Sequence, residues 1–348
     1  MDDAAPPIRR RSRFWLFAPF AVVAFVILAW CLAWFVIRAR TEEGIDAWLA
    51  CEAAAGRQWT CADRSVDGFP FRVEVGCSEV SLRRGDLTAA AGRFQAVAQI
   101  YQPRHVIVQL AGPLRVAEAG VAAEGRWRLF EASVRSSREG LRQLSAVMTE
   151  AAWQVTGPAP EPLAGSAARL EIHARPSPAR DDDALDIVAR AGQAAVPLLD
   201  RALGTPEPAD LELQARATRS LRLVGEPVAA ELERWRESGG ALDIVLLKLV
   251  KGAGRLEARG RLGLDPEHRV EGRIEGAAAG ADTVLRALLG DGRAGLAAGL
   301  LGALAGRAGR PQGGSDAALQ PLPPLRLENG RVFLGPLPVP GVRLTPLY

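Results

Sequence analysis

The chain has little of the chemistry that enzymes commonly use. Only three histidines occur in 348 residues, His105, His173 and His268, and none stands in an acid–nucleophile pattern. Neither a Gly-x-Ser-x-Gly nucleophile elbow nor a Walker phosphate loop is present. The run Asp181-Asp182-Asp183 is typical of a solvated loop rather than a cation site. We therefore expect a protein that is not an enzyme, with no catalytic residue, metal ligand or cofactor.

Lysine is also scarce, with Lys248 and Lys251 standing beside 41 arginines. This imbalance indicates a GC-rich genome rather than a binding specificity. The net charge is +3, and six arginines and two aspartates fall within residues 1–40. The remainder is close to neutral, which argues against nucleic acid as its partner.

Cysteine is limited to four residues, of which Cys61 and Cys77 flank the turn-forming pair Asp67-Gly68. A hairpin would bring these two together, and a disulfide there would stabilise the fold by about 3 kcal/mol in the chain-entropy model. Cys51 is then a spare thiol. A metal site is the alternative, but no histidine lies within residues 41–100.

The sequence does contain one long apolar run, at residues 14–37. These residues contain no charge, and 24 residues suffice to cross a bilayer core of about 30 Å. Four arginines precede the run and two follow it, which keeps residues 1–13 in the cytoplasm and exports the main domain. A cleaved signal peptide and a lipoprotein signal at Cys31 are the alternatives, but the run is long for the first and Trp30 is too large for the second.

After the span we expect a stalk helix over residues 38–60, capped by Thr41 and ended by Gly56. A continuation of the transmembrane helix fits the same residues equally well. Residues 61–348 would then form one β-rich domain, with a sub-boundary near 195–225.

From Ser65 the apolar period changes to two, which predicts strands separated by short turns. Residues 141–155 fit a helix or a strand, and their context favours a strand. Helices are expected at 227–237 and 281–309, and Asn329-Gly330 predicts a hairpin. The pattern is that of an extended antiparallel meander. The expected strands are 87–100, 104–111, 113–118, 126–135, 141–155, 168–174, 184–190, 210–217, 241–250, 253–263, 268–276, 325–328 and 331–334.

The motif Gly68-Phe69-Pro70-Phe71-Arg72 has two interpretations. It fits a ligand contact or a packed strand entry, and we favour the strand entry. Pro70 would then occupy a position where the ladder needs no donor.

Several short motifs, in order, resemble one family. The front half has the span, Asp67-Gly68-Phe69-Pro70-Phe71-Arg72 and Ala111-Gly112-Pro113-Leu114; the back half has Gly260-x-Leu262-x-Leu264-Asp265, Gly272-Arg273 and Asn329-Gly330-Arg331-Val332. Together they resemble the bacterial domain-of-unknown-function family 2125. The resemblance implies a protein anchored in the inner membrane and facing the periplasm, and it transfers no catalytic residue.

A weaker resemblance is to AsmA-like envelope proteins, which implies a long curved sheet with an apolar inner face. The expected fold class is α+β, mainly β: one N-terminal transmembrane helix, then a long curved antiparallel sheet with a few packing helices. The expected function is to hold or pass lipid acyl chains without chemistry. The alternative is a structural protein of the cell envelope that recruits a protein partner.

Overall fold

The computed structural model describes residues 14–138, 140–158, 161–178, 183–197, 200–201, 204–219, 228–279 and 319–348. Within these ranges the chain forms helices α1 (Phe14–Ala54) and α3 (Val228–Glu237) and one antiparallel sheet. The expected tail 1–13 and the expected helix 281–309 lie outside the described residues. The strands are β1 (Gln58–Ala62), β2 (Ser65–Asp67), β3 (Arg72–Cys77), β4 (Glu79–Arg84), β5 (Leu87–Ala91), β6 (Phe94–Gln99), β7 (Gln102–Leu110), β8 (Leu114–Glu118), β9 (Val121–Arg126), β10 (Leu129–Ser137), β11 (Gly140–Thr156), β12 (Leu163–Pro176), β13 (Leu185–Ala194), β14 (Ala209–Ala217), β15 (Leu242–Lys251), β16 (Gly254–Leu264), β17 (Val270–Ala279), β18 (Gln320–Pro321), β19 (Leu325–Glu328), β20 (Arg331–Leu334) and β21 (Leu337–Arg343).

Helix α1 is continuous for 41 residues, so the helix formed by the apolar run 14–37 continues without a break into the segment that was expected to be a separate stalk. Thr41 does not cap a second helix; its hydroxyl donates a hydrogen bond to the carbonyl oxygen of Ile37 inside α1. The helix ends before Gly56, whose φ of +78° suits glycine. In the described part of the chain, α1 is the one helix long and apolar enough to cross a membrane.

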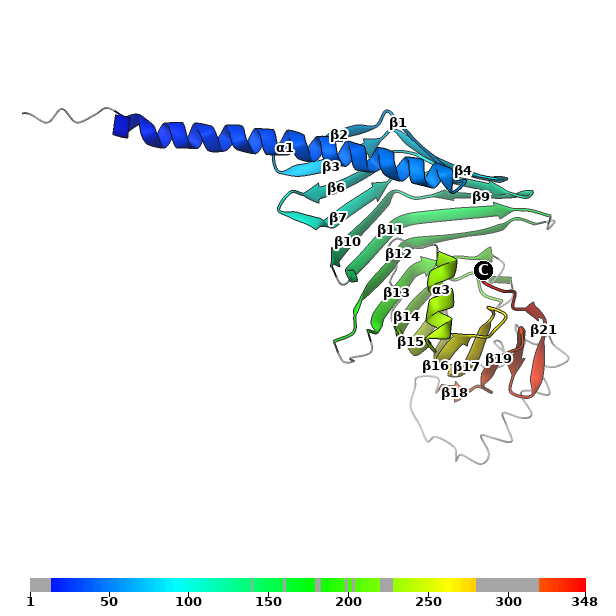
Figure 1. Cartoon of the computed structure of the whole chain (residues 1–348). Helices are drawn as coiled ribbons and strands as arrows, with labels where there is room; N and C mark the ends of the chain where they lie inside the picture. Colours follow the sequence, from blue (N-terminus) through cyan, green and yellow to red (C-terminus); the bar gives the residue numbers. More distant parts are fainter. Residues whose placement is uncertain are drawn as a thin grey trace, which may run out of the picture.

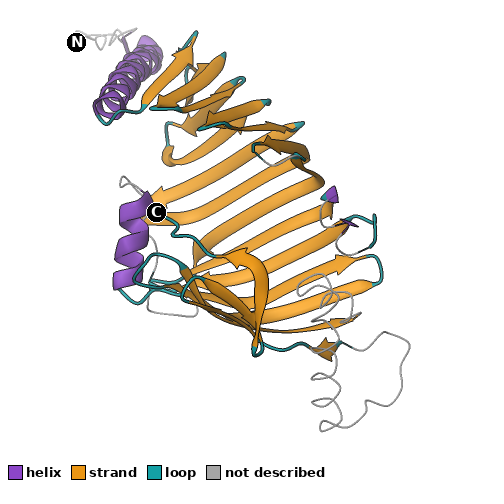
Figure 2. Cartoon of the chain, turned by 90° about the vertical axis from the view of Figure 1, so that its right-hand side faces the viewer, coloured by secondary structure: helices purple, strands orange, loops and turns teal. Residues whose placement is uncertain are grey.

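The sheet is a single curved layer in which successive strands lie side by side (Figures 1 and 2). The first part of α1 extends beyond the sheet, and its last turns run alongside the first strands. From β11 onward each strand pairs with the next, from β11–β12 to β16–β17. The predicted meander and the predicted fold class are therefore confirmed.

The first strands of this meander are each broken in two near the middle. β1 and β2 pair with β4 and β3, and β5 and β6 pair with β8 and β7, so each broken pair continues one line of the sheet. Residues with positive φ mark the break at Asp63, at +46°, and in the unbroken β11 at Glu150, at +52°. We call this line of breaks the crease. Strands β2, β3, β6 and β7 lie on one side of it, and β1, β4, β5 and β8 lie on the other side, which we describe as beyond the crease.

Strand β1 begins at Gln58, inside the segment that was expected to be the stalk helix 38–60. The crease explains another error in the predicted strands. Residues 87–100 were expected as one strand, but the chain breaks at Gly92-Arg93 into β5 and β6. Strand β9 was not predicted, because its sequence VAAEGR is small and weakly alternating. Strand β21 was expected as a proline-rich tail; it pairs with β20 at the end of the sheet.

The C-terminal strands close the far end of the fold. β19, β20 and β21 turn back over the end of the sheet (Figure 2). Val332, Leu334 and Val339 form a buried cluster there. Helix α3 lies at the strand ends, where the indole of Trp235 donates a hydrogen bond to the carbonyl oxygen of Thr218 at 2.8 Å.

Candidate functional site

The predicted motif Gly68–Arg72 forms the loop between β2 and β3, and this loop packs against α1. The indole nitrogen of Trp30 donates to the carbonyl oxygen of Pro70 at 2.9 Å. The indole nitrogen of Trp34 donates to the carbonyl oxygen of Arg72 at 3.0 Å. Trp30 and Trp34 belong to the apolar run 14–37, and nothing in the sequence pairs them with this loop.

Aromatic rings also pack between helix α1 and the loop between β2 and β3. The ring of Phe69 lies 5.4 Å from Trp34, edge to face, and 6.5 Å from Phe35. The ring of Phe71 lies 6.0 Å from Trp30. These spacings are those of favourable aromatic pairs. The motif is thus both a strand entry, since β3 begins at Arg72, and a contact surface for the helix.

Gly68 is required by the shape of this loop. Its φ is +104°, and a Cβ there would lie 2.7 Å from both Cγ and the carbonyl oxygen of Arg72. The Arg72 amide also donates back to the carbonyl oxygen of Gly68 at 3.1 Å. Any side chain at position 68 would therefore open the turn that presents Phe69 and Phe71.

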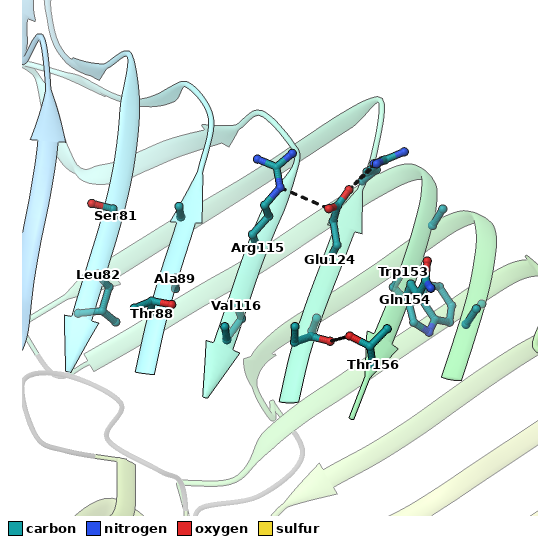
Figure 3. Close-up of a pocket in the computed structure, with 18 of the residues that line it drawn as sticks. Ser81, Leu82, Thr88, Ala89, Arg115, Val116, Glu124, Trp153, Gln154 and Thr156 are labelled. Carbon is teal, nitrogen blue, oxygen red and sulfur yellow. Dashed lines mark hydrogen bonds and ion pairs between the residues drawn. The ribbon is translucent and has the colours of Figure 1, made fainter. Parts of the chain in front are cut away.

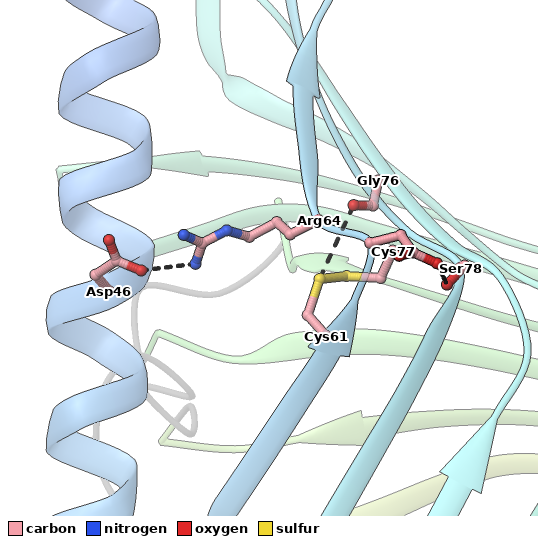
Figure 4. Close-up of a disulfide and its surroundings, with 7 residues drawn as sticks. Asp46, Cys61, Arg64, Gly76, Cys77 and Ser78 are labelled. Carbon is pink, nitrogen blue, oxygen red and sulfur yellow. Dashed lines mark hydrogen bonds and ion pairs between the residues drawn. A yellow bond between two sulfur atoms is a disulfide. The ribbon is translucent and has the colours of Figure 1, made fainter.

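The predicted pairing of Cys61 with Cys77 is present as a disulfide with a Cα–Cα distance of 5.3 Å (Figure 4). The disulfide joins β1, which lies beyond the crease, to β3, which lies on the other side of the crease with the β2–β3 loop. Next to it, Arg64 forms an ion pair with Asp46 of α1 at 2.7 Å. Cys51 is free, as expected for the spare thiol, and it is exposed on α1.

Strand register shows that one face of the sheet is apolar. Residues directly opposite each other on antiparallel strands point to the same face, so each cross-strand row lies on one side. We call two such rows the apolar strip. The first row is Val73, Ala98, Val106, Val134, Leu144, Ala174, Ile187, Ala215 and Ile244, and the second is Val75, Ala96, Val108, Ala132, Ala146, Ile172, Ala189, Leu213, Leu247 and Ala258.

The strip is covered unevenly along its length. Towards the C-terminal strands its members are buried, with Ala215 at 4% and Ile244 at 8% exposure. In the middle of the sheet Ile172 is 41% exposed. Its other end is β3, which follows the loop against α1. Ala174, a strip residue on the same strand as Ile172, is 8% exposed, so the apolar face is only partly open in the middle, and it leads towards helix α1.

A groove of about 1040 Å³ lies beyond the crease (Figure 3). Cys77 lies two residues beyond Val75 and shares its face. Cys61 lies two residues beyond Trp59 and shares its face, so the disulfide puts Trp59 on the apolar side. The neighbouring rows, which point the other way, all line the groove. They are Thr60, Ser81, Ala90, Arg115, Glu124, Gln154 and Ala164, with Gln58, Arg83, Thr88, Ala117, Ala122 and Thr156.

The groove is therefore mixed in character, because Leu82, Val116 and Trp153 line it as well as these small and polar residues. At its centre Glu124 accepts hydrogen bonds from Arg126 at 2.6 Å and from Arg115 at 3.3 Å. The hydrogen bond from Arg126, followed by the smaller contribution of Arg115, holds the pKa of the Glu124 carboxyl below its ordinary value. A carboxylate between two guanidinium groups suits a polar or charged ligand rather than an acyl chain. Sequence reasoning singled out none of these residues, and only their register brings them together.

The three histidines lie apart, each in its own local contacts. His105 contacts the hydroxyl of Ser133 at 3.0 Å, His173 lies 3.7 Å from Glu171, and the ring of His268 stacks on Tyr348 at 4.3 Å. Among the described residues no group of three or more His, Cys, Asp or Glu is placed to hold a metal ion. Asp181 and Asp182 lie outside those residues.

A helix long and apolar enough to cross a membrane, followed by a one-layer antiparallel meander, defines the class of fold. Within it, the chain belongs to the family described as an uncharacterized protein conserved in bacteria (DUF2125), whose profile matches residues 34–342. The resemblance found in the sequence motifs is thereby confirmed. No curated protein matches the chain. No solved structure matches it either.

Proposed function

We propose that this protein is a non-enzymatic, single-span protein of the bacterial inner membrane that holds or passes lipid acyl chains on the apolar strip. Residues 14–37 cross the membrane, residues 1–13 stay in the cytoplasm, and the sheet lies in the periplasm. The excess of arginine before the span supports this orientation. The Cys61–Cys77 disulfide supports an oxidising compartment.

The observation that carries the proposal is the apolar strip, half-open at Ile172 and continuous towards the helix. From β3 to β13 it crosses six strand spacings of about 4.8 Å, which is about 29 Å and close to the thickness of a bilayer core. Each methylene moved from water onto such a surface gains about 0.8 kcal/mol. An acyl chain needs no further chemistry to be held there. The AsmA-like resemblance supports the same idea by analogy only.

The test introduces the same charge on each face of the sheet. Ile172→Arg places a guanidinium on the strip, and Gln143→Arg places one on the exposed opposite face. Full-length protein is extracted from membranes and bound lipid is counted by native mass spectrometry. We expect lipid on the wild type and on Gln143→Arg, and its loss from Ile172→Arg. A wild-type protein without lipid, or equal lipid on both variants, would refute the proposal.

The ion pairs in the groove favour a second candidate, which is recruitment of another envelope protein. Arg115, Glu124 and Arg126 offer charged contacts across the floor of the groove. A specific protein partner that is lost on Glu124→Arg, from a protein whose bound lipid is unchanged, would assign that role to the groove. Loss of lipid without loss of a partner would leave the strip as the functional surface.

A further inference from the structure

Three aromatic side chains near the outer end of the span are exposed. Phe69 is 53% exposed, Phe71 is 61% exposed and Tyr101 is 64% exposed. Phe69 and Phe71 lie in the loop between β2 and β3, and Tyr101 lies in the turn between β6 and β7. The amide of Ile100 donates to the carbonyl oxygen of Phe71 at 3.0 Å, so the two turns are adjacent. Large exposed aromatics that gather in one place mark a contact surface.

Their level along α1 is fixed by the two indole hydrogen bonds. Trp30 and Trp34 hold the loop beside residues 30–34 of the helix. The 20 residue steps from Phe14 to Trp34 correspond to about 30 Å, the thickness of the hydrocarbon core. When α1 spans a bilayer from Phe14, the three exposed rings therefore lie where the core meets the headgroups.

The chemistry of the two turns suits that zone. Aromatic side chains favour the membrane interface, where the apolar ring can contact the acyl chains while the tyrosine hydroxyl stays in contact with water. Arg72 and Arg104 are exposed and lie close in sequence to the three aromatic residues. Guanidinium groups bind phosphates through two parallel hydrogen bonds, so these arginines suit lipid headgroups. Arg72 also forms an ion pair with Glu74 at 3.2 Å, which holds it at the start of β3.

We propose that Phe69, Phe71 and Tyr101 enter the interface of the outer leaflet as a second membrane attachment beside α1. Two attachments fix the tilt of the sheet, which a single helix leaves free. They also place the β3 end of the apolar strip against lipid. This inference rests on the membrane-spanning part of the proposed function and does not require that an acyl chain is bound.

The test measures depth at single sites in the full-length protein in phospholipid nanodiscs. Cys31→Ala and Cys51→Ser remove the free thiols, and a nitroxide is then attached at Tyr101→Cys or Phe71→Cys. Oxygen concentrates in lipid and a nickel chelate in water, so the ratio of their collision rates reports depth. Phe25→Cys in the span is the lipid control. Val121→Cys, at the start of β9 beyond the crease, is the water control.

We expect the oxygen-to-nickel ratio at positions 71 and 101 to shift from the value at 121 towards the value at 25. Tyr101 is the decisive site, because it is exposed and its replacement leaves the aromatic contacts with α1 intact. Ratios at 71 and 101 equal to that at 121, with position 25 in lipid, would overturn the inference alone. A water-like ratio at position 25 would overturn the membrane-spanning assignment itself.

Discussion

The indole nitrogen of Trp34 lies 3.0 Å from the carbonyl oxygen of Arg72, to which it donates a hydrogen bond across 38 residues of sequence. Trp34 is only 4% exposed, although it belongs to the apolar run that predicts the span. Most of that run is open, as at Phe20 and Phe25, each 71% exposed. Helix α1 is therefore packed against the sheet at Trp34, and we call this contact the joint.

Trp34→Phe removes this hydrogen bond and keeps an aromatic ring. We expect it to destabilise the joint by about 1 kcal/mol, since the carbonyl oxygen of Arg72 loses its donor. Trp34→Ala also removes the ring contacts and is expected to cost about 3–5 kcal/mol. Hydrogen exchange of residues 67–77 in detergent-solubilised protein measures both. Phe25→Leu, on the exposed side of α1, is the control, and exchange equal to that control in both variants would show that the joint contributes nothing.

The disulfide is the second device that holds the first strands together. Cys61 and Cys77 are 16 residues apart in sequence, and a closed loop of that size stabilises by about 3 kcal/mol in the chain-entropy model. Cys77→Ser should therefore lower the free energy of unfolding by about that amount. Denaturant unfolding followed by tryptophan fluorescence measures the change.

Two comparisons make this prediction specific. Reductant should destabilise the wild type and leave Cys77→Ser unchanged. Cys51→Ser should behave as the wild type, because Cys51 is free and exposed. Equal sensitivity of all three proteins to reductant would contradict the role of the bond.

The meander was predictable because alternation is a local signal. Strands such as β15 and β16 carry it within 10 or 11 residues, and Asn329-Gly330 predicts its hairpin by turn chemistry alone. The crease was not predictable, because a strand break at Gly92-Arg93 resembles a mid-strand glycine. The long α1 was only half predicted, since residues 38–54 fit a new helix and a continued one equally well.

The candidate surfaces were harder to predict because they depend on pairs far apart in sequence. The motif around Phe69 was recognised, but its partner Trp34 was seen only as part of the apolar run. The groove beyond the crease depends on strand register, which places Arg115 opposite Glu124. The apolar strip was predicted in kind, since alternating strands must present such a face, but not in its open and closed parts.

The stability of the helix end should depend on pH through Glu52. Arg57 donates two hydrogen bonds to its carboxylate, each at 2.6 Å, and Trp59 adds one at 3.1 Å. The bonds from Arg57, above all, lower the pKa of Glu52 from 4.5 to about 2. A lowered folded-state pKa contributes stability that is present above pH 4.5 and lost as the pH falls towards 2.

The matching experiment compares unfolding of the wild type and Glu52→Gln between pH 2 and pH 7. We expect Glu52→Gln to be less stable near neutral pH, and the difference to shrink as the pH falls through the window from 4.5 to 2. Subtracting the two profiles removes the contribution of the other carboxylates. A difference that stays constant across this window would show that Glu52 does not titrate with folding.

Gly260, in the family motif Gly260-x-Leu262-x-Leu264-Asp265, has a packing role that substitution would reveal. A Cβ on Gly260 would overlap the carbonyl oxygen of Arg273 and lie 2.8 Å from the Cα of Ile274. Because these are backbone atoms of the neighbouring strand, they cannot rotate away. Gly260→Ala should therefore destabilise the sheet by about 1–3 kcal/mol. Gly263→Ala, three residues along β16, is the control, since its Cβ would meet only the carbonyl oxygen of Gly240 at 3.9 Å. Thermal unfolding in detergent should separate the two variants, and equal midpoints would mean that β16 and β17 can move apart at no cost.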